Sequence, residues 1–445
     1  THYPVNADTL LAAYRALSQA PLPNRPTAFR GRAAGYDVLL LVLETAPSAV
    51  IGVGSGESLP PTLRELSRNA FLAPQHHTTY PYTTRAIFSI FTSWYPGNNT
   101  FDVTKRLEEE GKGVMLPGIV RDAANAGYTT ALFGPDSLDN FEHDRSRFLA
   151  LGFDSLFTPA HDSLPLAVAG AQGTSAGDVR RQRATAKDQA ALALLKQRIQ
   201  RAVATNQRYF YSFLPQYTHA PWPDVTAASS QAQVFASGRQ LFQVVDDWLG
   251  EIVAELRALG TLDRTLVVVV GDHGIRTRLE HPNFVAGTLD AISFHVPFLI
   301  SAPGVLSRPY VVPWVTSHID VSPTLAELLG FSGERSLEMG SPIWEPALRQ
   351  RTTYFFARNY FGADGYFAND SVYMFKYPIQ SSFSAPWGGA LDFRLGNMLP
   401  PGSATATEIA DRVDRMTVLQ ESWSHFMLPE HYHTVFPPGP ASAGR

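Results

Sequence analysis

Unbroken apolar runs mark the strands that this sequence predicts. Residues 38–43 read VLLLVL and residues 266–270 read LVVVV, with no polar position inside either run. Such runs are typical of strands buried on both faces, whereas a half-exposed strand alternates apolar and polar residues. Residues 209–214 and 296–301 are mostly apolar and predict two further strands of this kind. The pattern therefore predicts a sheet that is covered on both sides.

Helical patterns separate these strands. Apolar positions recur at helical spacing in residues 7–19, 84–92 and 240–259. The charged stretch 178–201 also predicts a helix, with a solvated face, and SPTLAELLG predicts a short helix with Ser322 as its N-cap. Strands that alternate with helices predict an α/β fold, with three αβα layers around one large, mostly parallel sheet.

The pattern changes near residue 336. Residues 352–379 place aromatic residues between Gly and Asn turns, which is typical of antiparallel strands. We therefore predict three parts. Residues 1–30 form a helix and a Pro-rich linker, residues 31–335 the main α/β domain, and residues 336–445 a smaller antiparallel subdomain with a tail.

Composition narrows the chemistry. The 445-residue chain has a formal net charge of −4, which gives no electrostatic reason to expect nucleic acid or an anionic membrane as a partner. The absence of cysteine excludes disulfides, thiolate metal ligands and a cysteine-derived formylglycine. No apolar run reaches the roughly 18 residues of a membrane span. Because the sequence begins at Thr1, we expect a processed or trimmed chain, and a lost membrane anchor or export signal stays open.

Two of the buried strands end in residues that can bind a metal. Glu44 follows the first run, and Asp272 and His273 follow the run at 266–270. In open α/β sheets, ligands bind beyond the carboxyl ends of the strands. Two carboxylates and an imidazole at that edge favour a divalent cation, and the mixed oxygen and nitrogen donors suit zinc or manganese. Taken singly, Glu44 also fits an exposed strand end, and the sequence GDHG also fits a tight polar turn.

The segment TTRAIFSIFTSWYP, residues 83–96, offers a nucleophile. Thr83 lies where a helix should start, so free backbone N–H groups and the helix dipole face an anion there. A threonine hydroxyl bound to a metal loses its proton more easily and becomes a nucleophile. A plain N-cap role for Thr83 is the alternative. Thr84 and Arg85 are predicted to bind substrate, although Arg85 also fits a surface position.

Together these segments resemble the alkaline phosphatase superfamily, in its sulfatase-like branch. The resemblance rests on the Glu44-Thr45 pair, the run from Thr83 to Pro96, and the segments GDHG and SHIDVSPTLAELLG, in the order of the family. The Glu-Thr pair is similar to that of lipoteichoic-acid synthases and phosphoethanolamine transferases. The threonine segment resembles that of nucleotide pyrophosphatases/phosphodiesterases. The resemblance covers most of residues 36–330.

The resemblance implies a set of site residues. Glu44, Thr83, Asp272 and His273 would hold the metal, and Thr83 would be the nucleophile. True sulfatases carry a formylglycine at the position of Thr83, so a threonine in a cysteine-free chain argues against their chemistry.

Two further histidines resemble the substrate-side histidines of the transferases, which bind phosphate, protonate the leaving group or hold a second metal. They are His219 and His295, both predicted to be catalytic. His295 precedes its strand, so it reaches the crevice only if that strand is antiparallel or the loop folds over. Gln216 stands where the phosphodiesterase branch has an aspartate, so we expect one divalent metal rather than two. The remaining histidines are predicted to be structural (His318) or to lie in a mobile loop (residues 76–77).

These features imply that residues 31–335 are a sulfatase-like catalytic domain. It would perform metal-dependent phosphoryl-type transfer or hydrolysis through a phosphothreonine, on a phosphoester small molecule, a lipid head group or a glycan. The sequence leaves hydrolase and transferase open, and we expect a periplasmic or extracellular location. The alternatives are a soluble phosphodiesterase or phosphonate monoester hydrolase, and a catalytically inactive module of the same fold that binds a phosphorylated or sulfated glycan.

Overall fold

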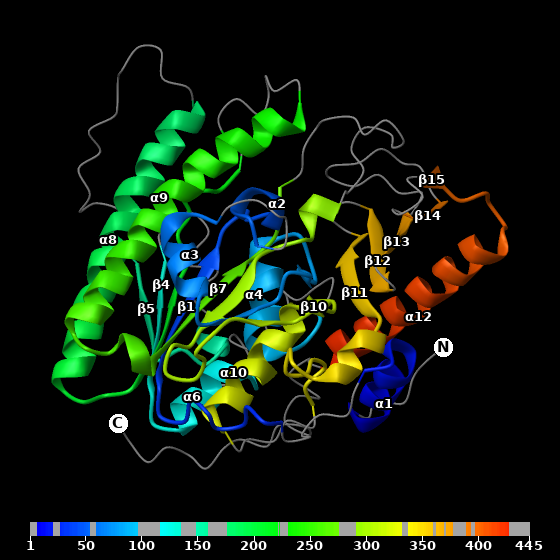
Figure 1. The fold of residues 1–445 in the computed structure, drawn as a ribbon. Coiled ribbons are helices and arrows are strands. Elements are labelled where there is room, and N and C mark those ends of the chain that lie inside the picture. The colour runs from blue at the N-terminus through cyan, green and yellow to red at the C-terminus, as the bar shows by residue number, and fades with distance from the viewer. Residues whose placement is uncertain are drawn as a thin grey trace.

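The computed structural model places a central sheet between helices, with a smaller sheet to one side (Figure 1). It describes residues 7–20, 27–53, 59–96, 116–134, 148–158, 176–220, 222, 230–275, 291–331, 337–358, 362–368, 371–376, 389–392 and 397–426. The predicted Pro-rich linker at residues 21–26 and the C-terminal tail lie outside these residues.

The central sheet has eight strands in the order β5-β4-β6-β1-β7-β8-β2-β9. Their bounds are β1 Asp37–Leu43, β2 Ala70–Leu72, β4 Thr129–Phe133, β5 Ser155–Phe157, β6 Tyr209–Phe213, β7 Thr265–Gly271, β8 Phe298–Ser301 and β9 Tyr310–Val311. Strand β1 lies in the middle and pairs in parallel with both β6 and β7. Strand β8 runs antiparallel to its neighbours β7 and β2. The sheet is thus mostly parallel, as the apolar runs predict.

Both faces of β1 are buried because alternate side chains enter two different cores. Val38, Leu40 and Val42 belong to one hydrophobic cluster. Leu39 and Leu41 belong to the other. A strand with this alternation needs apolar residues at every position, which explains the unbroken run.

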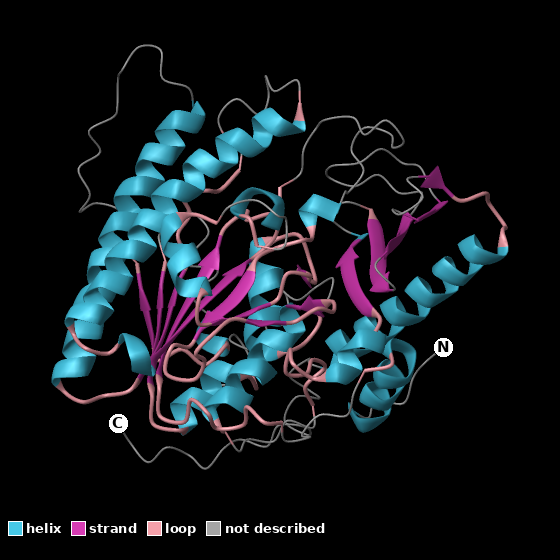
Figure 2. Cartoon of the chain, viewed as in Figure 1, coloured by secondary structure: helices cyan, strands magenta, loops and turns pink. Residues whose placement is uncertain are grey.

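Helices form the two outer layers (Figure 2). On one face lie α4 (Thr83–Thr92), α6 (Ile119–Asn125) and α10 (Val321–Leu329). On the other lie α2 (Ser48–Ile51), α3 (Pro61–Ser67), α8 (Ala176–Ala204) and α9 (Gln231–Ala258). The three-layer αβα prediction is confirmed.

Helix starts differ in detail from the prediction. Helix α9 begins nine residues before residue 240 because the Ser230 side chain caps it, accepting a hydrogen bond from the Gln233 N–H. Helix α10 begins at Val321, with Asp320 at its N-cap, so the prediction of Ser322 as N-cap is wrong. The preceding turn η4 (His318–Asp320) carries a capping box between Ser317 and Asp320, which fixes the entry to α10.

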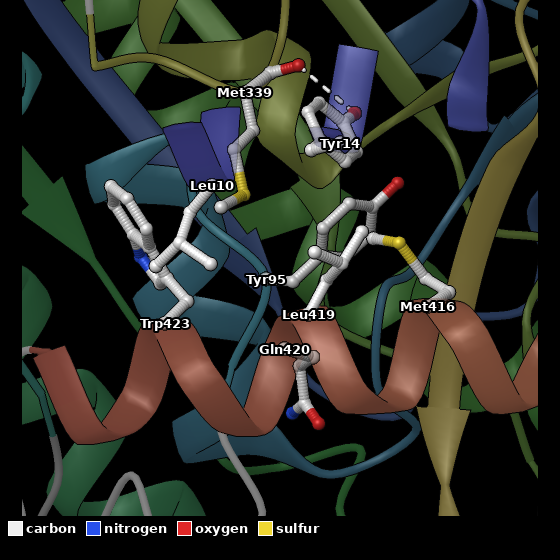
Figure 3. Close-up of a pocket in the computed structure, with 8 residues that line it drawn as sticks. All are labelled: Leu10, Tyr14, Tyr95, Met339, Met416, Leu419, Gln420 and Trp423. Carbon is white, nitrogen blue, oxygen red and sulfur yellow. Dashed lines mark hydrogen bonds between the residues drawn. The ribbon is translucent and has the colours of Figure 1, made fainter. Parts of the chain in front are cut away.

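The smaller sheet is antiparallel, in the order β11-β12-β13-β14-β15, which agrees with the predicted fold class. Its strands are β11 Thr353–Ala357, β12 Ala363–Ala368, β13 Ser371–Lys376, β14 Gly389–Asp392 and β15 Asn397–Met398. Helix α12 (Ala404–Phe426) packs against it and against α1 (Ala7–Ser18). A small, mostly apolar pocket lies where α1 and α12 meet (Figure 3). It is lined by Leu10, Tyr14, Tyr95, Met339, Met416, Leu419, Gln420 and Trp423.

A third, two-stranded sheet corrects one prediction. The residues expected in a mobile loop form β3 (His76–His77), which pairs in parallel with β10 (Thr316–Ser317) and is buried. Three short 3-10 helices complete the described elements, η2 (Leu262–Arg264), η3 (Ala291–Ser293) and η5 (Pro346–Gln350). None of the helices in the described ranges has a stretch both apolar and long enough to span a bilayer.

Candidate active site

Adjacent strands bring the two predicted acids together. Strands β1 and β7 pair in register so that Leu43 lies opposite Gly271. Glu44 and Asp272, the next residues on each strand, therefore leave the sheet side by side. One ligand atom from each of Glu44, Asp272 and His273 lies within 4.8 Å of the others. The chain thus assembles this cluster at the carboxyl edge of the sheet, as the sequence predicts.

The turn after β1 locks the cluster in place. Thr45 adopts a left-handed backbone conformation with φ of 48°, which is uncommon for a residue with a side chain. Its N–H donates to Asp272 Oδ1 at 2.8 Å, and its hydroxyl donates to Glu44 Oε1 at 2.6 Å. Such strained residues concentrate at functional sites, where surrounding contacts hold them.

Thr83 faces the cluster from the start of α4. It is the first helical residue, and Tyr82 occupies the N-cap without a side-chain capping bond. The Thr83 hydroxyl lies 3.1 Å from Glu44 Oε2 and 3.3 Å from His273 Nε2. The alternative that Thr83 is merely an N-cap is therefore wrong. Its hydroxyl instead points at the acids and the imidazole.

The two carboxyl groups have opposite pKa shifts. Burial alone would raise the pKa of Glu44, but His219, His273 and the hydroxyls of Thr45 and Thr83 bring it below its ordinary value. Burial, followed by the nearby charge of Glu44, raises the pKa of Asp272 well above its ordinary range. Burial and mutual repulsion thus act against charge on Asp272, whereas the imidazoles and hydroxyls favour charge on Glu44.

The donor atoms fit a divalent metal. Asp272 is fully buried, and its Oδ2 has no hydrogen-bond partner among the described residues. The Nδ1 of His273 lies 2.8 Å from the carbonyl oxygen of Gly274, which leaves Nε2 directed at the carboxylates. A buried, unpaired carboxylate oxygen beside an oriented imidazole is costly unless a cation binds there. Glu44, Asp272, His273 and the Thr83 hydroxyl would hold that cation.

The loop after β6 closes one side of the site. The Gln216 side-chain amide donates to Glu44 Oε2 at 3.3 Å, and the Thr218 hydroxyl donates to the Glu44 carbonyl at 2.6 Å. His219 follows, with its Nδ1 2.5 Å from the Ala220 carbonyl oxygen. The charge of His219 is the strongest favourable one acting on Glu44. This loop brings the predicted catalytic histidine within electrostatic range of the acids.

The remaining predicted residues lie around the site without joining the cluster. Strand β8 is antiparallel, so His295 does lie at the correct edge of the sheet. Its Nε2, however, lies 2.6 Å from the Pro74 carbonyl oxygen, and its ring stacks on His77. The catalytic role of His295 stays a prediction.

The two residues predicted to bind substrate, Thr84 and Arg85, lie in the first turn of α4. The hydroxyl of Thr84 is buried and has no hydrogen-bond partner among the described residues. The guanidinium of Arg85 lies over the Tyr80 ring, 4.3 Å from its centroid. Their roles in substrate binding also stay predictions.

The sequence reasoning missed one buried acid near the site, Asp188 of α8. The helix was predicted to have a solvated face, yet Asp188 is fully buried. Its spacing carried a signal, because Asp188, Leu192, Leu195 and Ile199 recur at helical intervals on one face. An acid within an apolar helical stripe indicates a buried partner.

Comparison with known proteins gives the class of this chain. The family model described as "Sulfatase" matches residues 36–331, more than half of the chain. The chain therefore belongs to the sulfatase family, in the sulfatase-like branch of the alkaline phosphatase superfamily.

Individual relatives match this chain either over a short segment or at low sequence identity. Arylsulfatase K from Bos taurus is 39% identical over 85 residues, 19% of this chain and only 15% of the bovine protein. The lipoteichoic acid synthase LtaP from Listeria monocytogenes superposes with a TM-score of 0.62 at 19% identity, covering 93% of this chain and 98% of LtaP. An alkaline phosphatase superfamily protein from Vibrio parahaemolyticus gives a TM-score of 0.64 at 18% identity, covering 94% and 96%. At these identities, the structural likeness concerns the fold.

Proposed function

We propose that this protein transfers a phosphoryl-type group from a phosphoester through a covalent intermediate on Thr83. The observation that carries the proposal is the position of the Thr83 hydroxyl, which lies within hydrogen-bonding distance of both Glu44 and His273 at a helix start. The superfamily and the similarity in fold to LtaP support this class of chemistry. The substrate would be a phosphoester small molecule, a lipid head group or a glycan, met in the periplasm or outside the cell.

The chain's own residues account for the steps. The first backbone N–H groups of α4, beside Thr83, would face the oxygens of the transferred group. The Thr83 hydroxyl, which donates to Glu44 Oε2, gives its proton to that carboxylate as its oxygen forms a bond to phosphorus. The bond from phosphorus to the leaving alcohol breaks, and protonated His219 gives its proton to that alcohol. A zinc or manganese ion bound by the four donor residues would ease loss of the Thr83 proton and stabilise charge on the group in transfer.

The second step needs an acceptor. Water or an alcohol gives its proton to His219 and attacks phosphorus. The bond from phosphorus to Thr83 breaks, and Glu44 returns the proton that restores the Thr83 hydroxyl. Water makes the protein a hydrolase and an alcohol makes it a transferase. A soluble phosphodiesterase or phosphonate monoester hydrolase would use the same residues.

Similarity to arylsulfatase K favours a second candidate, hydrolysis of sulfate esters. The residue at position 83 argues against it. A hydrated formylglycine has a second hydroxyl on the carbon that carries the sulfate, and this hydroxyl can expel the sulfate. A sulfated Thr83 has no such hydroxyl, so sulfate release would depend on attack by water or another acceptor. We therefore expect phosphodiesters to be turned over faster than sulfates.

The test compares substrates and variants in the zinc- or manganese-loaded protein. The substrates are bis(4-nitrophenyl) phosphate, 4-nitrophenyl phosphate, a phenylphosphonate monoester and 4-nitrophenyl sulfate. For the phosphodiester, Thr83→Ala should lower kcat/KM by roughly 10³-fold or more, whereas Thr83→Ser keeps a nucleophile and retains part of the rate. Intact mass spectrometry of rapidly quenched wild-type protein should show one added phosphoryl group, absent from Thr83→Ala.

Two results would overturn the proposal. Equal turnover by wild-type protein and Thr83→Ala would place the reaction elsewhere. Metal binding without turnover of any substrate, and without a covalent adduct, would instead support an inactive module that binds a phosphorylated or sulfated glycan.

A further inference from the structure

Asp188 is a buried acid that the proposed steps do not use. It projects from α8, a helix of the outer layer, and its side chain is fully buried. Burial, as the largest influence, raises its pKa well above the ordinary range, and the nearby charge of Glu44 raises it further. A buried carboxyl group without a role would be a costly feature, so its partners are informative.

Its partners are backbone N–H groups of the loop after β6. Both carboxylate oxygens lie 3.0 Å from the Gln216 N, and Oδ2 lies 2.8 Å from the Tyr217 N. These N–H groups lie beyond the end of a strand and have no partner within the sheet, so the carboxylate satisfies them. Asp188 therefore fixes the backbone at the point where the chain leaves β6.

The same loop makes two hydrogen bonds to Glu44 and carries His219. Gln216 donates its amide to the Oε2 of Glu44, Thr218 donates its hydroxyl to the carbonyl of Glu44, and His219 follows directly. A shift of the backbone at Gln216 would displace its amide from Glu44. Groups that orient metal ligands from behind typically change metal affinity by 10- to 100-fold when they are lost.

We propose that Asp188 is a positioning residue, which acts on the metal site through the Gln216–His219 loop without touching substrate or metal. The inference rests on the proposed function, because it assumes that Glu44 is a metal ligand. It adds a contribution from the outer helical layer to a site otherwise built from the sheet edge and α4.

The chain offers a matched control in Asp246 of α9. Asp246 is also a buried acid on an outer helix, and its two oxygens accept the backbone N–H groups of Thr62 and Leu63 at 2.8 and 2.9 Å. These groups belong to the start of α3 rather than to the loop beside Glu44. Asp188→Ala and Asp246→Ala therefore remove the same kind of acceptor at two places.

The experiment titrates manganese into the chelator-treated full chain by calorimetry, with thermal unfolding measured alongside. Both variants should lose stability. Asp188→Ala should bind manganese 10- to 100-fold more weakly than wild type, while Asp246→Ala should stay within about twofold. Gln216→Met, which leaves Asp188 and the backbone in place, should also weaken manganese binding. When the substitutions at positions 188 and 216 are combined, the loss of binding free energy should be smaller than the sum of the two single losses.

Manganese affinity within twofold of wild type in folded Asp188→Ala would reduce Asp188 to a structural residue. If Asp188→Ala does not fold, unchanged affinity in Gln216→Met overturns the inference in its place. Both outcomes differ from failure of the proposed function, which would appear as no manganese binding or no turnover in the wild-type protein.

Discussion

At the scale of single residues, the site places two buried acids side by side, where a bound cation would offset their mutual repulsion. Glu44 and Asp272 are both buried, and their pKa values shift in opposite directions. Asp272 Oδ1 accepts the N–H groups of Thr45 and His273, at 2.8 and 2.5 Å, while Oδ2 has no partner among the described residues. The two adjacent acids therefore destabilise the metal-free protein, but they are already arranged to bind a cation.

Replacing Asp272 by Asn should reveal this conflict. Asparagine keeps an oxygen for the two N–H groups and removes an acid beside Glu44. At pH 8, the metal-free variant should be more stable than metal-free wild type by about 1 kcal/mol or more, measured by denaturant unfolding.

Metal binding should reverse this order of stability, so that wild type becomes the more stable protein. Manganese at about 100 times its Kd should stabilise wild type by about 2.7 kcal/mol and leave the Asn variant nearly unchanged. A metal-free variant that is less stable than wild type would contradict the conflict between the two acids.

At the scale of elements, one ion pair joins the main sheet's helices to the segment that leads into the smaller sheet. Asp320, at the N-cap of α10, receives two hydrogen bonds from the guanidinium of Arg351, at 2.6 and 2.5 Å, and both side chains are fully buried. Asp320 also accepts the N–H groups of Ser317 and Ser341, at 2.8 and 2.9 Å. Every oxygen lone pair of Asp320 thus has a donor, which offsets much of the cost of burying the pair, whereas Nε of Arg351 has no hydrogen-bond partner among the described residues.

Arg351→Met should therefore be strongly destabilising. Removing one partner leaves the other charge buried, with an expected loss of about 3–5 kcal/mol in the free energy of unfolding. Adding Asp320→Asn should recover part of that loss. Arg415→Met is the control, because Arg415 and its partner Asp411 are exposed on α12, and it should change stability by less than about 0.5 kcal/mol. Similar losses for both arginine variants would refute a special role for the buried pair.

At the scale of the whole molecule, buried histidines lie where the two sheets meet. His76, His77 and His318 are buried, and the His77 ring lies 3.9 Å from that of Phe367 on β12. His318 bridges the Gly271 carbonyl, at 2.9 Å, and the Thr78 hydroxyl, at 3.2 Å. This agrees with the structural role predicted for it. These imidazoles are held neutral because burial lowers their pKa, to about 3 for His318.

This arrangement predicts a loss of stability in acid. The unfolded chain binds a proton at His318 near pH 6.5, whereas the folded chain does so only near pH 3. The stability contribution is therefore fully present above pH 6.5 and falls by about 1.4 kcal/mol per pH unit below it. His318→Gln should remove this dependence.

Denaturant unfolding of wild type and His318→Gln at pH 7.5 and pH 5 checks the prediction. The difference in unfolding free energy between the two proteins should narrow by about 2 kcal/mol at the lower pH. Asp37, whose pKa burial raises to about 6, acts in the opposite direction but is present in both proteins. A difference that does not change with pH would contradict the assignment.

The sequence by itself determined the long buried strands, the layers and the three candidate metal ligands at the strand ends, and the resemblance added Thr83. It could do so because burial on both faces demands unbroken apolar runs, and because parallel strands must end at one edge, which brings Glu44 and Asp272 together. Only the tertiary structure decided where long-range partners lie. It showed that Asp188 reaches the loop beside Glu44, that the residues 76–77 form a buried strand, and that His295 is hydrogen-bonded to Pro74. Such contacts join segments far apart in the chain, so no local spacing or propensity specifies them.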